Sequence, residues 1–304
     1  MPDQNNARIR NAVFEWLRDQ VARHGDVLPR DLLASGFEVE GVRVPLLSPQ
    51  GIFKPKVLTD GPLSITTAPG GPYDDAFGLD GLLQYRYRGN DPDHRDNVGL
   101  RAAMVQRLPL VYFHGLVPGK YVATWPVYIV ADHPEELKVS VAVDDAQYQG
   151  RFSGNAVPDL SEPDELRRRY ATAAVRVRLH QRSFRERVLE AYQRQCAFCR
   201  FKHEEMLDAA HILPDSHPDG EPHVRNGLSL CTLHHAAFDR YFVGLTPNYV
   251  IEVRPDILKE KDGPTLAHAI QGLHGKKILL PVLKQHRPDT DLLAIRYELF
   301  AANR

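Results

Sequence analysis

The sequence has no run of about 18 apolar residues, the length that a helix needs to cross a bilayer. Its first residues, MPDQNNARIR, also lack the apolar segment of a secretion signal. The chain of 304 residues has only three cysteines, an odd number that is unsuited to a disulfide framework. We therefore expect a cytoplasmic protein with reduced cysteines and no membrane segment.

The sequence also lacks a net charge of either sign. Lys and Arg number 38 against 39 Asp and Glu, which gives a formal net charge of -1. No global basic field therefore attracts nucleic acid, and such a partner has to be bound by local patches. The hydrophobic share of 43% and the charged share of 25% are those of an ordinary globular protein, and the length predicts two domains.

The order of patterns along the chain predicts an α+β protein. Residues 6–24 place apolar side chains near helical spacing, which is typical of an amphipathic helix. Short β-rich runs such as LLQYRYRG and YVATWPVYIV follow, separated by Gly and Pro, and favour a curved sheet or barrel. A Pro-rich and acidic stretch near residue 155 indicates a boundary. We expect domains at 1–150 and 178–304, joined by a helical linker at 151–177.

The chain becomes basic after this boundary. Between residues 167 and 194, nine arginines are opposed only by Glu186 and Glu190. A solvated helix face with salt bridges is one interpretation. The other is a set of phosphate contacts, for which Arg178, Arg182 and Arg185 are the candidates.

Two short motifs predict a structural zinc ion. Cys196 and Cys199 form a Cys-x-x-Cys pair, and Cys231 and His234 form a Cys-x-x-His pair. Together they are a complete set of ligands for tetrahedral Zn²⁺, which would join the ends of an element that buries little apolar surface. Two alternatives stay open: His203 competes for the fourth position, and the cysteines are also explained as reduced thiols.

A second motif set overlaps these pairs: His211, Asn226, His235 and Asp239 occur in AAHILP, NGLSLC and HHAAFD. The three motifs closely resemble the HNH (ββα-metal) endonuclease family, in particular its predicted bacterial restriction endonucleases, over roughly residues 178–300. The resemblance implies a β-hairpin that presents the first His and a helix that presents the last ligands around one divalent ion. It also implies that Asn226 fixes the His211 ring by hydrogen bonding.

The residue types fit phosphodiester hydrolysis. The reaction needs an activated water, a Lewis acid and stabilisation of the leaving oxygen. An imidazole with a pKa near 6.5 suits a general base at neutral pH, which we assign to His211. His235 and Asp239 are four residues apart, so on a helix they face one way and share a cation. These ligands leave Mg²⁺, Mn²⁺, Ni²⁺ and Zn²⁺ open, and we favour Mg²⁺ or Mn²⁺.

One position departs from the HNH pattern. Ala210 stands where the family often has a His or Asp metal ligand. Asp208 is a weak substitute, because in a strand it shares a face with Ala210 and not with His211.

The first domain resembles an SRA-type (PUA-like) domain. The resemblance is carried by GGPYDDAFGLDGLLQYRYRG at residues 70–89, then by HRDNVGL and KYVATWPVYIV. It implies that a modified cytosine is flipped into an aromatic pocket. On this basis Tyr73, Tyr85 and Tyr87 supply ring faces and Asp74 or Asp75 accepts a hydrogen bond from the cytosine amino group. Asn97 would support the phosphate or the flipped base.

Two departures leave the ligand of this domain open. Pro72 is inserted before Tyr73, and Arg88 stands where the family usually has Thr. The modification is therefore 5-methylcytosine, 5-hydroxymethylcytosine, a phosphorothioate or another group. The alternative is that the tyrosines are half-buried strand residues, since Tyr is favoured in strands.

These observations together predict a modification-dependent (type IV-like) restriction endonuclease that acts on double-stranded DNA. We expect a homodimer, because one HNH centre cuts one strand. A nuclease without a modification requirement is the second hypothesis. A zinc-containing DNA-binding module without catalysis is the third: Ala210 favours it, and the intact His211 and Asn226 argue against it.

Overall fold

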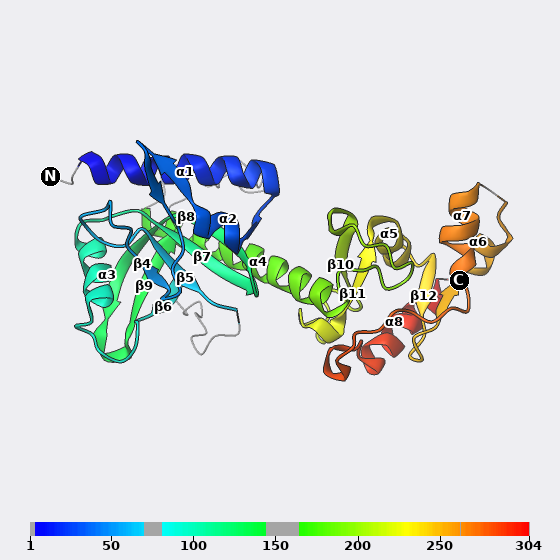
Figure 1. The fold of residues 1–304 in the computed structure, drawn as a ribbon. Helices are drawn as coiled ribbons and strands as arrows, with labels where there is room; N and C mark the ends of the chain where they lie inside the picture. Colours follow the sequence, from blue (N-terminus) through cyan, green and yellow to red (C-terminus); the bar gives the residue numbers. More distant parts are fainter. Residues whose placement is uncertain (1–3, 70–80, 144–163, 262, 304) are drawn as a thin grey trace. The chain divides into compact units, whose positions relative to one another are not determined.

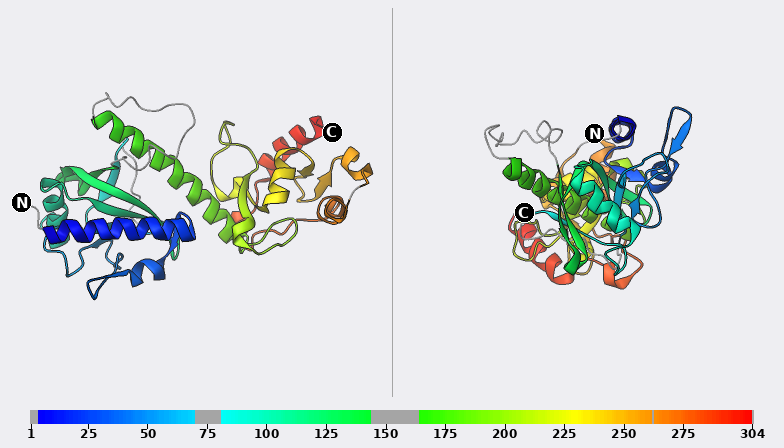
Figure 2. Two further views of the ribbon diagram at one scale, coloured as in Figure 1. Left: turned by 90° about the horizontal axis from the view of Figure 1, so that it is seen from above. Right: turned by 90° about the vertical axis from the view of Figure 1, so that its left-hand side faces the viewer.

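The computed structural model describes residues 4–69, 81–143, 164–261 and 263–303 and divides the chain into an N-terminal unit, 1–179, and a C-terminal unit, 180–304. The division falls inside one unbroken helix, α4 (Asp164–Ala191), which also takes up the second half of the predicted linker (Figures 1 and 2). Val175 and Leu179 of α4 are buried in a core of the N-terminal unit. No helix among the described residues is long and apolar enough to span a membrane.

In the described part of the N-terminal unit, a long first helix and two shorter helices accompany a seven-stranded sheet and a separate two-stranded sheet. The helices are α1 (Gln4–His24), α2 (Arg30–Ser35) and α3 (Arg95–Val105). The strands are β1 (Val27–Pro29), β2 (Phe37–Val39), β3 (Val42–Val44), β4 (Ile52–Phe53), β5 (Ser64–Thr67), β6 (Leu83–Arg86), β7 (Leu110–Val117), β8 (Lys120–His133) and β9 (Lys138–Val143). The expected helix at 6–24 is thus confirmed.

The main sheet has the order β4-β5-β7-β8-β9-β6, with β1 paired to β8, and it curls into a half-barrel. Only the β5–β7 pair is parallel among the described pairings. Both faces are covered, which explains the unbroken apolar run in β7: Leu110 and Tyr112 enter one core and Val111 and Phe113 the other. Helix α1 packs on the second face, as Figure 1 shows. The α+β expectation and the curved sheet are confirmed.

The C-terminal unit is built from short elements around one core. Its strands are β10 (Leu207–His211), β11 (Gly227–Cys231), β12 (Val243–Leu245) and β13 (Ile251–Val253). Its helices after α4 are α5 (Thr232–Asp239), α6 (Pro255–Lys259), α7 (Pro264–Ala269) and α8 (Thr290–Ala302). The core collects buried side chains from all parts of this unit, including Val188, Leu230 and Leu293.

A glycine sets how closely α4 approaches the β10–β11 hairpin. A Cβ atom on Gly227 would lie 2.4 Å from Cγ2 of Val188 and 3.0 Å from the Phe184 ring, both on α4. Gly227 is also the residue opposite His211 in the hairpin. The helix therefore packs directly against the strand end that carries the predicted general base.

Candidate functional site

The C-terminal unit forms a ββα element at the position of the predicted motifs. Strands β10 and β11 pair antiparallel, from Leu207 opposite Cys231 to His211 opposite Gly227. Helix α5 begins directly after Cys231 and contacts both strands. His211 therefore ends the first strand, while His235 and Asp239 come from the helix.

The His211 ring is held by stacking. Its centroid lies 4.1 Å from that of Phe184, with 13° between the ring planes, and its Nε2 lies 3.0 Å from Oδ1 of Asp215. Burial lowers the pKa of His211 below its ordinary value, with the Asp215 carboxylate opposing the shift. A lowered pKa keeps the imidazole neutral near pH 7, the form that a general base requires.

Asn226 acts on the chain next to His211 and not on its ring. The Asn226 side chain is fully buried. Its oxygen accepts from Leu213 N at 2.9 Å, and its nitrogen donates to the carbonyl oxygens of Leu213 at 2.9 Å and Glu221 at 3.1 Å. The expected hydrogen bond to the His211 ring is corrected accordingly: Asn226 fixes the loop that leaves β10, and Phe184 fixes the ring.

His235 and Asp239 lie side by side on α5. Nε2 of His235 is 3.3 Å from Oδ2 of Asp239. This separation is close to the roughly 3 Å between neighbouring ligands in an octahedral shell with metal–oxygen distances near 2.1 Å. The pair therefore fits a shared divalent ion, and both side chains are at least partly exposed to solvent.

The four predicted zinc ligands come together in a second cluster. The ligand atoms of Cys196, Cys199, Cys231 and His234 all lie within 4.8 Å of one another. Nδ1 of His234 is 3.3 Å from Sγ of Cys196 and 3.2 Å from Sγ of Cys231. His203 is exposed and is not one of this group, so the fourth position belongs to His234.

The surroundings of this cluster suit a bound cation. Nε2 of His234 is 2.7 Å from the carbonyl oxygen of Ala269, so the ring can donate there and turn an unprotonated Nδ1 to the sulfurs. Hydrogen bonds with Cys196 and Cys231 raise the pKa of the Cys199 thiol far above its usual range. Three thiolates at this distance repel one another, and a divalent ion such as Zn²⁺ removes that repulsion.

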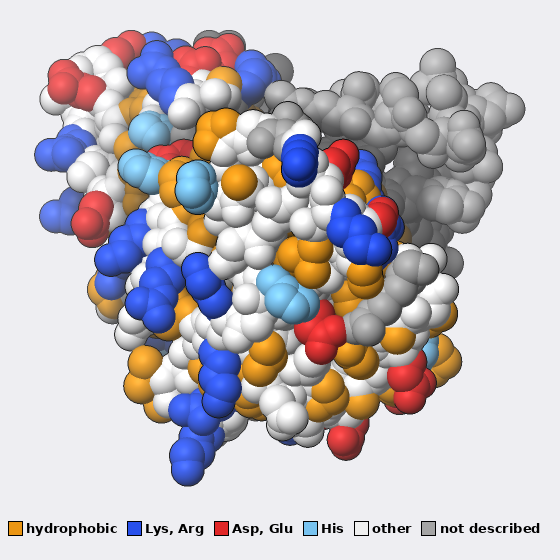
Figure 3. All heavy atoms as spheres, turned by 90° about the vertical axis from the view of Figure 1, so that its right-hand side faces the viewer, with side chains coloured by type: hydrophobic (Ala, Val, Ile, Leu, Met, Phe, Trp, Pro, Cys, Tyr) orange, Lys and Arg blue, Asp and Glu red, His pale blue; other side chains and the backbone are white. Residues whose placement is uncertain are grey.

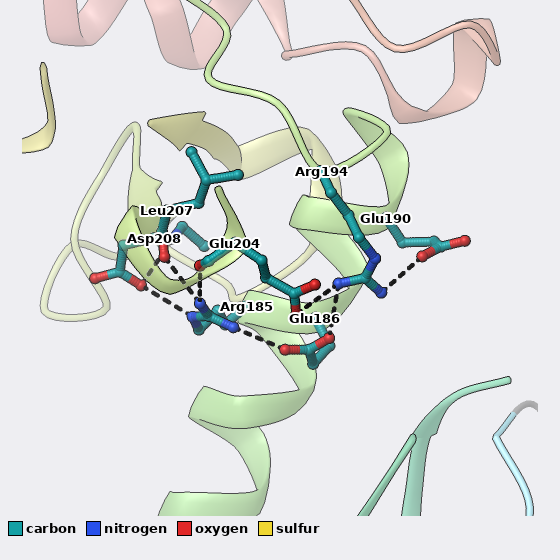
Figure 4. A network of polar contacts seen from close by, with 8 residues as sticks. Arg185, Glu186, Glu190, Arg194, Glu204, Leu207 and Asp208 are labelled. Atoms are coloured by element: carbon teal, nitrogen blue, oxygen red, sulfur yellow. Dashed lines mark hydrogen bonds and ion pairs between the residues drawn. The ribbon is translucent and has the colours of Figure 1, made fainter. Parts of the chain in front are cut away.

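The predicted phosphate contacts of α4 are mostly occupied by protein groups. Arg185 donates to the carbonyl oxygens of Leu207 at 2.8 Å and Glu204 at 3.2 Å, and it contacts Glu186 at 2.7 Å (Figure 4). Arg178 pairs with Asp26 at 3.3 Å inside the N-terminal unit, and Arg182 is half-buried. Arg178 and Arg185 therefore form the salt bridges of the first interpretation, but their side chains are largely shielded from solvent, so they do not form a solvated helix face.

Other cations of the C-terminal unit are exposed. Figure 3 shows a band of Lys and Arg side chains on the face that is turned toward the viewer. Lys276, Lys277 and Lys284 are exposed lysines of this unit. They are more exposed to solvent than Arg178 and Arg185 of α4.

Arg296 supports the end of α5. It is 8% exposed, donates to the carbonyl oxygen of Phe238 at 2.8 Å, and lies over the Phe238 and Tyr241 rings at 4.6 and 4.4 Å. Because Phe238 precedes Asp239, Arg296 fixes the helix turn that presents this carboxylate. Sequence reasoning missed it, since a single arginine in α8 carries no local signal.

The N-terminal unit holds a cavity of about 520 Å³. Its lining consists of residues 47–52, 66–68 and 85–88, together with Arg30 and Tyr121. This volume is in the range of small-molecule and base pockets. The arginines at 30, 86 and 88 bring positive charge to a lining that otherwise consists of apolar, hydroxyl, amide and aromatic groups.

The predicted reader residues differ in how they meet this cavity. Tyr85 and Tyr87 line it but are 5% and 2% exposed, so they do not present open ring faces as expected, because both are packed in a core of this unit. Half-buried Tyr121, which the sequence did not single out, offers more ring surface. Tyr73, Asp74 and Asp75 lie outside the described residues.

Asn97 fixes the loop that follows β6, at the edge of the cavity where Arg88 lies. Asn97 is fully buried, accepts from Arg88 N at 2.9 Å, and donates to the carbonyl oxygens of Arg88 at 3.1 Å and Asp91 at 2.8 Å. The Arg88 guanidinium pairs with Asp96. Asn97 therefore holds the backbone after β6 and does not reach a phosphate or base, which corrects the expected role.

Comparison with known proteins agrees with the C-terminal geometry. Residues 196–246 match the HNH endonuclease family, so the chain carries an HNH endonuclease domain there. No curated protein matches the sequence. One similar solved structure is described as a modification-dependent TagI restriction endonuclease; it is 17% identical, with a TM-score of 0.29, over 79% of this chain and 82% of that chain. The matched residues and their geometry, rather than this distant similarity, define the domain.

Proposed function

We propose that the chain is a metal-dependent endonuclease that cuts modified double-stranded DNA. The observation that carries the nuclease part is the ββα element of the HNH domain, with a stacked His211 at the end of β10 and the His235–Asp239 pair on α5. A base and a metal-binding pair on one small element are the groups that phosphodiester hydrolysis needs.

His211 takes the proton from the attacking water in this proposal. Phe184 holds its ring and burial keeps it neutral, so a proton is accepted at neutral pH. His235 and Asp239 would hold the divalent ion, Mg²⁺ or Mn²⁺, which supplies Lewis-acid stabilisation of the phosphate charge. Asn226 keeps the loop after β10 in place, and Zn²⁺ at the Cys196 cluster would hold the strand–helix junction together.

The reader part is assigned to the cavity of the N-terminal unit. A volume of about 520 Å³ accepts a nucleobase, and Tyr121 offers a surface for stacking. Arg30 and Arg86 are exposed and suit the phosphates on either side of an extruded nucleotide. Modified cytosine is the proposed ligand. Cutting both strands requires two nuclease centres, so the proposed functional form is a homodimer.

The test is cleavage of one plasmid prepared in four forms: unmodified, 5-methylated, 5-hydroxymethylated and phosphorothioated. Each form is incubated with Mg²⁺ or Mn²⁺, with EDTA as the metal-free control and His211→Ala as the chemistry control. We expect cutting of a cytosine-modified form only, and none with EDTA or His211→Ala. Equal cutting of all forms would reject the reader, and cutting by His211→Ala at the normal rate would reject the assigned base.

A cavity variant locates the reader. Tyr121→Ala is expected to weaken binding of the cleaved DNA form about 5-fold or more, since base stacking contributes about 1–3 kcal/mol. Tyr128→Ala, at a position on β8 that does not line the cavity, is the matched control. If both variants bind the modified DNA as tightly as the original chain, the ligand is read elsewhere.

A further inference from the structure

Asp208 lies against the metal-binding pair, although strand alternation separates it from His211. It is on β10, and its Oδ2 is 3.4 Å from Nδ1 of His235. On the other side of the ring, Nε2 of His235 faces Oδ2 of Asp239 at 3.3 Å. The imidazole is thus held between two carboxylates, one at each nitrogen.

The two ring nitrogens define different roles for the two carboxylates. A histidine that binds a metal uses one nitrogen as the ligand, and its other N–H is commonly held by a carboxylate that fixes the tautomer and the ring orientation. With Asp208 at Nδ1, the proton stays on Nδ1 and Nε2 is left as the ligand atom. Nε2 is on the Asp239 side of the ring, so an ion bound to Nε2 lies on the side away from Asp208. Asp208 therefore does not replace the ligand that is missing at Ala210.

Asp208 is itself held from two sides. Its Oδ1 accepts from Ala209 N at 2.9 Å and lies 3.7 Å from Nε of Arg185. Arg185 is fixed by the carbonyl oxygen of Leu207 and by Glu186, which is only 1% exposed (Figure 4). A carboxylate with such partners has a defined position rather than a mobile one.

The ion-pair network continues behind Arg185. Arg194 binds Glu186 from the other side at 3.3 Å and also contacts Glu190 at 2.9 Å and Glu204 at 2.9 Å. The network therefore ties α4, the turn before β10 and the start of β10 into one unit. This explains why Arg185 of α4 is turned toward protein groups and not toward solvent.

We propose that Asp208 is a positioning residue of the nuclease centre: it holds His235 so that Nε2 faces Asp239, and Arg185 and the Ala209 amide hold Asp208. This inference rests on the proposed function. It also gives the ion pairs of α4 a role in the site, because contacts from Arg185 through Asp208 to His235 connect the helix to the metal-binding pair.

The test measures binding of Mn²⁺ alone, without DNA, by calorimetric titration of the zinc-loaded full chain. His235→Ala identifies the Mn²⁺ binding that belongs to this centre. Asp208→Ala is expected to weaken that binding 10- to 100-fold, the usual effect of losing the partner of a metal-binding histidine. Asp208→Asn is expected to fall between, because its amide oxygen still accepts from Nδ1. Asp256→Ala, which removes another exposed carboxylate of this unit, is the matched control and should not change Mn²⁺ binding.

Measurements of the cutting rate and of the melting temperature distinguish a positioning role of Asp208 from a catalytic or a purely structural one. Raising Mn²⁺ should restore most of the cutting rate of Asp208→Ala but none of that of His211→Ala, while the melting temperature of Asp208→Ala stays near the original. Unchanged Mn²⁺ binding in Asp208→Ala would overturn the proposal, as would a cutting defect that no Mn²⁺ concentration restores. If the original chain cuts no DNA but its Mn²⁺ binding falls with both His235→Ala and Asp208→Ala, the nuclease proposal fails and the positioning proposal stands.

Discussion

In the N-terminal unit the buried cation Arg10 is bound by backbone oxygens, whereas in the C-terminal unit the buried carboxylate of Glu186 is bound by two arginines. Arg10 is 1% exposed and donates to the carbonyl oxygens of Pro62 at 2.9 Å, Pro109 at 2.8 Å and Asp60 at 3.1 Å. Glu186 is equally buried, but its partners Arg185 and Arg194 each contact further titratable side chains.

This difference separates a structural charge from charges that reach a reactive centre. Backbone carbonyls do not titrate, so the contacts of Arg10 end at the protein scaffold. Side-chain partners have charges of their own, and the sequence of contacts from Glu186 through Arg185 and Asp208 ends at His235. The first arrangement stabilises a large sheet, and the second positions groups on a small element.

The largest effect is expected from breaking the cysteine–histidine cluster. His234→Ala removes one ligand and the contact with Ala269, and structural zinc sites contribute about 10–16 kcal/mol of apparent binding free energy to folding. We expect the C-terminal unit to lose zinc and amide protection from hydrogen exchange, while protection of the N-terminal unit is retained. Zinc content and segment-resolved exchange measure this.

His203→Ala is the control for this prediction, because His203 is an exposed histidine outside the cluster. The His203→Ala variant should keep its zinc and its amide protection from hydrogen exchange. Loss of protection in both units of His234→Ala would show that the units do not fold independently.

An intermediate effect is expected in the N-terminal unit. Arg10→Met leaves three carbonyl oxygens without their donor, which should lower the free energy of unfolding by about 2 kcal/mol. Burial lowers the pKa of Arg10 to about 10, so the residue is still charged at pH 7 and the loss is that of a charged donor. Denaturant unfolding followed by Trp fluorescence measures the change.

Arg8→Met provides the matched comparison, because Arg8 pairs with Glu40 on the surface and should contribute less than about 1 kcal/mol. Equal stability of the two variants would mean that the backbone contacts of Arg10 do not stabilise the unit.

The smallest effect is expected on the pH dependence of cutting. The Asp215 carboxylate opposes the lowering of the His211 pKa, so Asp215→Asn should lower that pKa further. The neutral base then persists to lower pH, and the acidic limb of kcat/KM should move down by less than about one pH unit. A pH–rate profile at saturating metal measures the limb.

Asp219→Asn, which removes a carboxylate near His217, should leave this limb in place. A limb that moves to higher pH in Asp215→Asn, or that moves equally in both variants, would contradict the assignment of His211 as the base.

Local sequence patterns were sufficient to predict features that depend on residues close together in the chain. The helical spacing at 6–24 and the Cys-x-x-Cys and Cys-x-x-His spacings concern neighbours in the chain, and the structure has the helix and the cluster. The run FEVEGVRVPLL at residues 37–47 is β-rich in composition but does not form one strand. It folds back at Glu40 and Gly41, both with positive φ, to form the β2–β3 hairpin, and Gly41 was the available turn signal.

The remaining site features depend on packing between elements. Alternation along β10 correctly separates Asp208 from His211, but it does not predict that α5 brings His235 to Asp208. Likewise, the basic composition of α4 does not predict that Arg185 donates to the carbonyl oxygens of Glu204 and Leu207. Both features require knowing how a helix lies against a hairpin, which a single sequence does not contain.

Two histidines in succession serve different centres: His234 belongs to the cysteine cluster and His235 pairs with Asp239. Successive residues of a helix point about 100° apart, so the two centres share one rigid turn. A single insertion between them would rotate one histidine away from its own partners. Anyone transplanting this domain into another scaffold therefore has to keep Cys231–Asp239 unbroken. The connection between the two strands has to keep its length as well, because Asn226 holds Leu213 and Glu221 there.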